Sequence, residues 1–244
     1  MLIAFVTLGA IAAEQAGDAI AEGQAVAVYE SRPLRADDAL FSESASISDP
    51  GVVQAANLIY GQNKTSVCFA DDFLAQIQKE TNVRTNRRFS PVKLDSQELY
   101  LYPFAIMTGE GDFSLTDQQR ENLRYYLTAG GFVVASPGCS NDAWDASFRR
   151  EVAAIFPDIE FVALDFDHPA FHTVYDIDRL VAKRTGAPPQ LEGVEIDGRL
   201  ALVYSREGLN DTANAGPNCC CCGGNEIRNA RDVNVNLLAY ALMH

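Results

Sequence analysis

The sequence predicts a doubly wound α/β domain with a mostly parallel sheet, on the strength of one central unit. Two short apolar runs, 103–108 and 132–135, flank a segment whose apolar residues recur at helical spacing. Strands that alternate with helices of this length form parallel sheets through right-handed crossovers. Ligands bind beyond the carboxyl ends of such strands, which here are 108–112 and 136–141.

The elements up to this unit follow from apolar patterning and turn residues. The run 52–60 predicts the first strand, and 69–80 predicts a helix with its apolar residues on one face. Segment 83–89 contains three arginines and predicts a basic edge strand. In the central unit, Ser114 is the expected N-cap of the helix, and Gly130-Gly131 predicts its end.

The second half of the chain predicts two helices and a hairpin. Segment 144–156 is amphipathic and predicts a helix, and 159–164 predicts a strand. Asp197-Gly198 lies between alternating residues and favours a type I′ turn, which predicts an appended hairpin over 194–204. Segment 229–243 predicts a C-terminal helix that packs on the sheet.

Composition limits the partners of the protein. The 244 residues are 48% apolar, enough for one domain with a sizeable core. The 33 acidic and 19 basic residues give a net charge of −14. This charge disfavours nucleic acid and anionic membranes as partners, and its simplest role is solubility.

The N-terminal residues predict export. Residues 1–13 combine a short apolar run with small residues at a cleavage site, and the run is too short to span a bilayer. We therefore expect a signal peptide and a periplasmic or secreted protein. No basic residue precedes Arg32, so the alternative is an N-terminal strand of a cytoplasmic protein. Residues 14–50 then form a linker or arm, and 51–244 form the α/β domain.

Six cysteines have two interpretations. They are Cys68, Cys139 and the run Cys219, Cys220, Cys221 and Cys222. In an oxidising compartment they predict disulfides, whereas in a reducing one the run predicts a soft metal such as zinc, copper or iron. Only Cys219 and Cys222 have the spacing of known sites, so the inner pair would bind a second ion or form disulfides with Cys68 and Cys139.

His168 and His172 are two of the three histidines in the chain. Their spacing of four residues is one that metal sites use, so both could join Cys219 and Cys222 around a metal. Alternatively, Asp167 caps a turn and the two histidines only form hydrogen bonds.

Cys139 is the candidate nucleophile because it follows a predicted strand end. A helix that starts after it would lower the pKa of the thiol, and His168 or His172 would be the base. The competing interpretation is a buried or disulfide-bonded cysteine.

A polar loop follows the first predicted strand and consists of Asn63, Lys64, Thr65 and Ser66. Its backbone N–H groups and the Lys64 ammonium are suited to an anionic ligand. The alternative is a capped turn without a ligand.

The order of motifs resembles the bacterial domain of unknown function 4159 over residues 51–244. The similar segments are NKTSVCF (63–69), YPFAIMTGEGDFSL (102–115), ENLRYYLTAGGF (121–132), SFRREVAAIFP (147–157), DHPAFH (167–172) and DVNVNLLAYAL (232–242). The resemblance implies a flavodoxin-like sheet related to class I glutamine amidotransferase domains, and no established activity. Those relatives carry a Cys-His-Glu triad on a G-x-C-x-G turn. This chain has PGCSN at 137–141 and no H-x-E motif near its C-terminus, so amidotransferase chemistry is not implied.

Two classes of function follow from the sequence. The first is a binding or scaffold protein of the cell envelope, whose cysteine loop holds a soft metal and whose partner is an envelope protein or a small ligand. The second is a cysteine- or metal-dependent hydrolase that uses Cys139 with His168, or a metal-bound water on the histidines. The first is preferred because no Asp or Glu is tied by spacing to either histidine.

Overall fold

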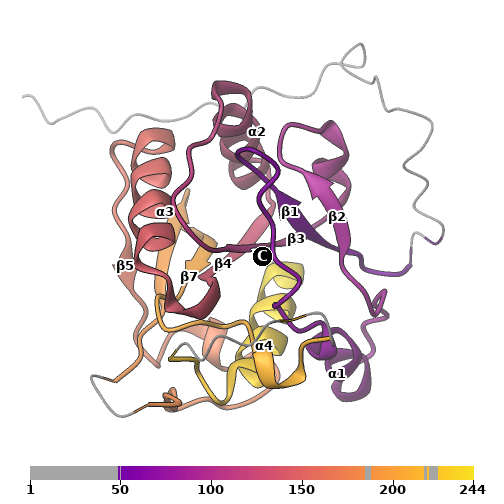
Figure 1. The fold of residues 1–244 in the computed structure, drawn as a ribbon. Coiled ribbons are helices and arrows are strands. Elements are labelled where there is room, and N and C mark those ends of the chain that lie inside the picture. Colours follow the sequence, from indigo (N-terminus) through magenta and orange to yellow (C-terminus); the bar gives the residue numbers. More distant parts are fainter. Residues whose placement is uncertain (1–48, 50, 185–187, 217–218, 220–224) are drawn as a thin grey trace, which may run out of the picture. The chain divides into compact units, whose positions relative to one another are not determined.

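The computed structural model describes residues 49, 51–184, 188–216, 219 and 225–244. The predicted signal segment, all of the predicted linker except Asp49, and Cys220, Cys221 and Cys222 lie outside the described residues. Figure 1 shows the arrangement of the helices and strands. Within the described residues, no helix combines the length and the apolar character that crossing a membrane requires.

Seven strands of the described residues form one sheet in the order β2-β1-β3-β4-β7-β6-β5. The first five strands in this order are parallel, and β6 and β5 continue the sheet in antiparallel pairing. This order is compatible with a flavodoxin-like fold that carries an added hairpin. The strands are β1 (Ala55–Ile59), β2 (Ser90–Lys93), β3 (Phe104–Gly109), β4 (Phe132–Pro137), β5 (Val162–Ala163), β6 (Glu192–Ile196) and β7 (Arg199–Tyr204).

Helices cover both faces of the sheet, which creates two hydrophobic cores (Figure 1). Helices α1 (Asp72–Glu80) and α4 (Ala230–Met243) pack on one face, and α2 (Asp117–Thr128) and α3 (Asp142–Ile155) pack on the other. All residues of β3 and β4 are buried, which explains why both strands are continuous apolar runs in the sequence. The predicted doubly wound fold is therefore confirmed.

The Asp197-Gly198 hairpin is also confirmed. Both residues have positive φ, 52° and 75°, as a type I′ turn requires. The turn joins β6 to β7, so the predicted hairpin is the means by which the sheet gains its antiparallel strands. The bulge between Val194 and Glu195 interrupts the register of this pair.

Two local predictions were wrong. Segment 83–89 forms only an isolated bridge between Thr85 and Val53. The edge strand is β2, whose four residues pair with β1 and whose Val92 is buried in the core. The helix after β3 starts later than predicted. Thr116, not Ser114, is its N-cap: the Thr116 hydroxyl accepts from the Gln119 N–H, and the Gln119 side chain accepts from the Thr116 N–H.

Candidate functional site

The loop after β1 folds back along its own strand. Asn57, in the middle of β1, donates through its side-chain amide to the Ser66 carbonyl at 2.8 Å, and the Thr65 hydroxyl donates to Asn57 Oδ1 at 3.1 Å. The backbones of Tyr60 and Lys64 pair in both directions. These contacts turn the chain back along β1, and α1 follows on one face of the sheet. The residues after the loop therefore lie beside β1 rather than beyond its end.

The predicted anion loop uses its polar groups within the protein. Lys64 Nζ donates to the Glu110 carbonyl at 2.9 Å, and the Ser66 hydroxyl accepts from the Cys68 N–H at 3.1 Å. Asn63 has a φ of 60°, a left-handed conformation that Asn tolerates in turns. The described contacts agree with the capped-turn alternative, and anion binding by residues 63–66 stays a prediction.

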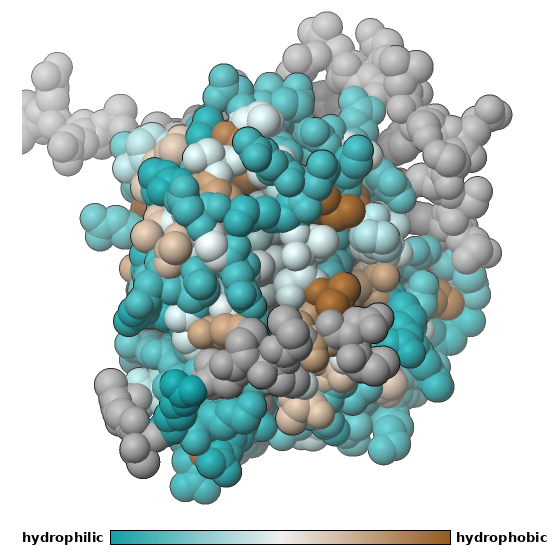
Figure 2. Space-filling view, viewed as in Figure 1, coloured by the Kyte–Doolittle hydropathy of each residue, from teal (hydrophilic) through white to brown (hydrophobic). Residues whose placement is uncertain are grey.

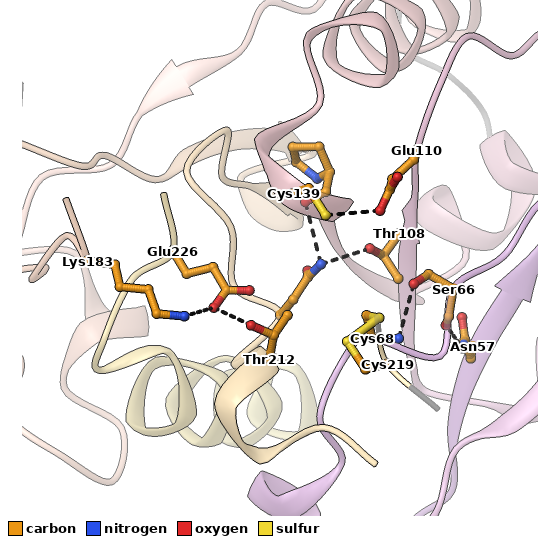
Figure 3. Close-up of a disulfide and its surroundings, with 12 residues drawn as sticks. Asn57, Ser66, Cys68, Thr108, Glu110, Cys139, Lys183, Thr212, Cys219 and Glu226 are labelled. Atoms are coloured by element: carbon orange, nitrogen blue, oxygen red, sulfur yellow. Dashed lines mark hydrogen bonds and ion pairs between the residues drawn. A yellow bond between two sulfur atoms is a disulfide. The ribbon is translucent and has the colours of Figure 1, made fainter. Parts of the chain in front are cut away.

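A disulfide joins this loop to the cysteine-containing loop at the other end of the chain. Cys68 and Cys219 are 151 residues apart in sequence, and their Cα atoms are 4.8 Å apart (Figure 3). Cys68 precedes α1, and Cys219 belongs to the connection between β7 and α4. Cys219 is therefore not a free thiolate for a metal in this structure. Within the described residues, no three His, Cys, Asp or Glu side chains are grouped as metal ligands.

The segment after β7 is fastened to the ends of two strands. Asn210 donates to the Thr108 hydroxyl at 3.2 Å, and its carbonyl accepts from the Ala70 N–H at 2.8 Å. The Leu209 N–H donates to the Ser136 hydroxyl at 2.9 Å. Because Thr108 and Ser136 are paired residues of β3 and β4, this segment lies across the carboxyl ends of the central strands.

A buried carboxylate closes the base of the cysteine-containing loop. Glu226 is 6% exposed and accepts from the Thr212 hydroxyl at 2.7 Å and from Lys183 Nζ at 3.0 Å (Figure 3). Nearby, burial raises the pKa of Asp211 above its usual value, although hydrogen bonds from Asn214 oppose this effect. These contacts hold residues 212 and 226 together, so the disulfide restrains a loop whose base is already fixed.

Cys139 occupies a strained turn between β4 and α3. It has φ 56° and ψ 25°, and Ser140 after it has φ 54°. Its Sγ atom lies 3.0 Å from Glu110 Oε1 (Figure 3). Cys139 is disulfide-bonded, so this contact is not a hydrogen bond from a thiol, and the sulfur is not a nucleophile in this oxidised state. The turn places the residue as predicted, at the carboxyl end of β4.

The structure does not bring Cys139 and His168 together. The His168 ring lies 5.6 Å from the Tyr240 ring, which lies 6.1 Å from Phe132 at the amino end of β4. Cys139 follows the opposite end of that strand, and the five steps from Phe132 to Pro137, at about 3.3 Å each, span roughly 17 Å. The nucleophile–base pair predicted for a hydrolase is therefore not assembled. The same separation keeps Cys219, which lies with Cys68 near Asn210, away from His168.

The two histidines form hydrogen bonds with their own segment. His168 Nδ1 accepts from the Ala170 N–H and caps a single helical turn at Pro169–Phe171. Both ring nitrogens of His172 contact oxygen atoms, one in the Phe166 carbonyl and one in the Asp176 carboxylate. These contacts occupy both ring nitrogens of His172, so neither is open to a metal in this structure. Of the two sequence interpretations, the hydrogen-bonding one fits the described geometry, although His168 rather than Asp167 caps the turn.

These contacts predict a pH-dependent contribution of His172 to stability. The Phe166 carbonyl and the Asp176 carboxylate raise the pKa of His172 above its usual value. The contribution is therefore complete below the unfolded-state pKa of about 6.5 and is lost as pH rises through the folded-state pKa. We expect His172→Gln to lower the free energy of unfolding in urea at pH 5.5 and to leave it unchanged at pH 8.5. An equal loss at both pH values would contradict this assignment.

A cavity of about 280 Å³ lies beside the disulfide. Its lining comes from both disulfide-linked loops and from the segment that leads into β2: Asn57, Val67, Phe69, Asp71, Arg88, Phe89 and Gly216. Phe69 and Phe89 pack edge to face with ring centroids 6.0 Å apart. Arg88 and Asp71 form an ion pair of 3.1 Å at its rim, where the Arg88 side chain is 80% exposed.

Sequence reasoning missed this cavity. The sequence predicts a basic edge strand for the segment that contains Arg88 and Phe89, and it predicts a helix that begins at Phe69. One signal pointed here: Cys68 directly precedes Phe69, so the position of the disulfide marks one wall. The partner loop that supplies Gly216 could not be found from sequence spacing.

Comparison with known proteins identifies the family. No curated protein matches the chain. Residues 55–242 match the model of a family described as Domain of unknown function (DUF4159), and this range begins with β1 and ends in α4. Because the match covers most of the chain and the whole described sheet, the protein is a member of the DUF4159 family.

Proposed function

We propose that this domain binds a small ligand in the cavity beside the Cys68–Cys219 disulfide. The proposal rests on one observation: residues that line the cavity come from the two loops that the disulfide joins. Val67 and Phe69 flank Cys68, and Gly216 lies three residues before Cys219. The disulfide therefore fixes two loops from distant parts of the chain as opposite sides of one cavity. Fixed walls favour binding because less conformational entropy is lost when the ligand is bound.

The lining indicates the class of ligand. Phe69 and Phe89 supply apolar surface, and Val67 at the rim is 61% exposed and adds to it. Figure 2 shows that hydrophobic residues otherwise occur in small patches on a largely hydrophilic face. Arg88 contacts Asp71 through Nη1, and the Nε and Nη2 groups of the same exposed guanidinium can donate to an anionic group of a ligand. These features suit a small molecule with an aromatic or apolar body and one anionic group.

The disulfide also supports a location outside the cytoplasm. Disulfides persist in oxidising compartments and are rare where thiol reductants are abundant. The apolar segment within residues 1–13 supports the same location. The proposed role is thus that of a binding module in the periplasm or outside the cell. The redox state of Cys68 in growing cells tests this location, because an oxidised Cys68 is expected only outside the cytoplasm.

A fluorescent probe with the required chemistry tests the proposal. Anilinonaphthalene sulfonate has an aromatic body and one anionic group, and its emission rises in apolar sites. We expect saturable binding at one site per chain. Arg88→Ala should weaken it at least about tenfold, because a charge-assisted hydrogen bond is worth about 1.5–3 kcal/mol. Phe89→Ser should weaken it at least as much.

Arg84→Ala is the matched control. Arg84 also forms an exposed ion pair with an aspartate, Asp49, at 3.2 Å, but it does not line the cavity. The proposal requires unchanged probe binding in this variant and weaker binding in the Cys68→Ser, Cys219→Ser double variant. Equal effects of Arg84→Ala and Arg88→Ala, with unchanged thermal unfolding, would refute a specific site.

A further inference from the structure

A second cavity, of about 360 Å³, lies at the C-terminal end of α2. One wall is the segment that leads into β3, and the other is the last turn of the helix. The lining residues are Tyr100, Leu101, Tyr102, Pro103, Tyr125, Tyr126, Ala129, Gly130 and Gly131, and we refer to them as the tyrosine groove. Four of its nine residues are tyrosines, so aromatic side chains form much of its lining.

The aromatic side chains of the groove are held in place. Tyr100 and Tyr125 pack edge to face with centroids 5.0 Å apart. The hydroxyl of Tyr126, which is 3% exposed, donates to the Tyr102 carbonyl at 2.8 Å. At Gly131, an added Cβ would lie 2.5 Å from the Tyr126 ring, so glycine is required for this close contact. The groove is therefore preformed rather than dependent on ligand-induced ordering.

Three sources of negative charge or partial charge lie near the groove. The C-terminal end of a helix carries partial negative charge. The Tyr102 hydroxyl donates to Glu98 Oε1 at 3.4 Å, which places a carboxylate near that ring. Burial, Tyr125 and the Glu121 carboxylate raise the pKa of Tyr100 to about 12, which places a second carboxylate close enough to act on the groove.

One protein cation already uses this end of the helix. Arg199 of β7 donates to the Leu127 and Gly131 carbonyls from the side of the sheet. It offsets part of the helix-end charge. The partly exposed rings of Tyr100 and Tyr125 and the Glu121 carboxylate supply the remaining attraction on the solvent side, because Tyr102 and Tyr126 are buried. The position of Arg199 shows that a guanidinium is accommodated at this helix end.

We propose that the tyrosine groove binds an organic cation, an alkylammonium or guanidinium group. Such cations are attracted to the faces of aromatic rings and lose less hydration energy than metal ions when they leave water. The net charge of −14 raises the local concentration of cations around the molecule. The cation belongs either to a free small molecule or to a peptide side chain. This site is independent of the cavity beside the disulfide.

Titration calorimetry of the full chain with choline chloride and with acetyl-arginine amide tests the proposal at constant ionic strength. Saturable binding below about 10 mM is expected for at least one probe. Preference for choline indicates a free ammonium compound, and preference for the arginine derivative indicates a peptide side chain. Tyr125→Leu should weaken binding about fivefold, because it removes a ring face and keeps an apolar side chain. Tyr125→Phe keeps the ring and should bind with nearly wild-type affinity.

Two further comparisons separate charge from apolar contact. The neutral isostere 3,3-dimethylbutanol should bind at least about tenfold more weakly than choline, and Glu121→Gln should weaken choline binding. Equal affinity for choline and its neutral isostere, or an unchanged affinity in Tyr125→Leu, would overturn the proposal. Failure of both probes to bind below about 10 mM would do the same. Unchanged binding of anilinonaphthalene sulfonate in these variants confirms that the other cavity is intact.

Discussion

Replacement of Cys68 by serine is expected to lower the free energy of unfolding by about 2–5 kcal/mol. The disulfide with Cys219 closes a loop of 151 residues. In the chain-entropy model, a loop of this length restricts the unfolded chain by about 5 kcal/mol, which is the upper limit of the expected effect. Urea unfolding of the oxidised wild type and the variant, followed by circular dichroism, measures the difference.

The double variant Cys68→Ser, Cys219→Ser identifies the source of the loss. If the covalent link between the two loops is responsible, the double variant should be no less stable than the single variant, within about 0.5 kcal/mol. A further loss in the double variant would instead show that the Cys219 side chain contributes through packing. An unchanged urea midpoint in the single variant would mean that the base contacts at Glu226 restrain the loop without the disulfide.

Trp144→Ala is expected to destabilise the domain by about 3–5 kcal/mol. Trp144 of α3 is fully buried and stacks on Phe148 with centroids 5.0 Å apart. Its indole N–H donates to the hydroxyl of Tyr60, which in turn donates to the Thr108 carbonyl at 3.0 Å. The substitution thus removes packing on the α2–α3 face and leaves a buried hydroxyl with one partner fewer.

Trp144→Phe separates these two effects. The phenyl ring retains most of the stacking, so the loss should fall to about 1–2 kcal/mol, mainly from the missing hydrogen bond. Because Trp144 is the single tryptophan of the chain, unfolding must be followed by circular dichroism rather than by tryptophan fluorescence. Equal losses in the two variants would contradict a cavity contribution from the indole.

The parts of the fold that were predicted correctly depend on local chemistry. Strands β3 and β4 are buried on both faces, so their sequences are continuous apolar runs. Asp197 and Gly198 tolerate positive φ, which fixes the hairpin within four residues. Strand β2 was missed because only Val92 of its four residues is buried, and such a short polar edge strand has little apolar pattern.

The candidate site could not be predicted because it depends on distant residues. The six cysteines allow many pairings, and which of them form is decided by the loop contacts that bring Cys68 and Cys219 within reach. Residues of β1 and of the loops before α1, β2 and α4 meet only after the sheet has formed. By contrast, Cys139 was placed correctly at the end of β4, since strand ends can be predicted from one apolar run.

The two outer strands of the sheet limit how the protein can associate with other chains. Strand β5 has two residues, and β2 has four, including Pro91, which has no N–H to donate. Neither edge offers the long row of backbone donors and acceptors that lets another chain add a strand. Edge-to-edge aggregation and β-strand exchange are therefore disfavoured. A partner protein is expected to recognise side chains on the helical faces or loops, and its binding should not increase the β-sheet signal in infrared spectra.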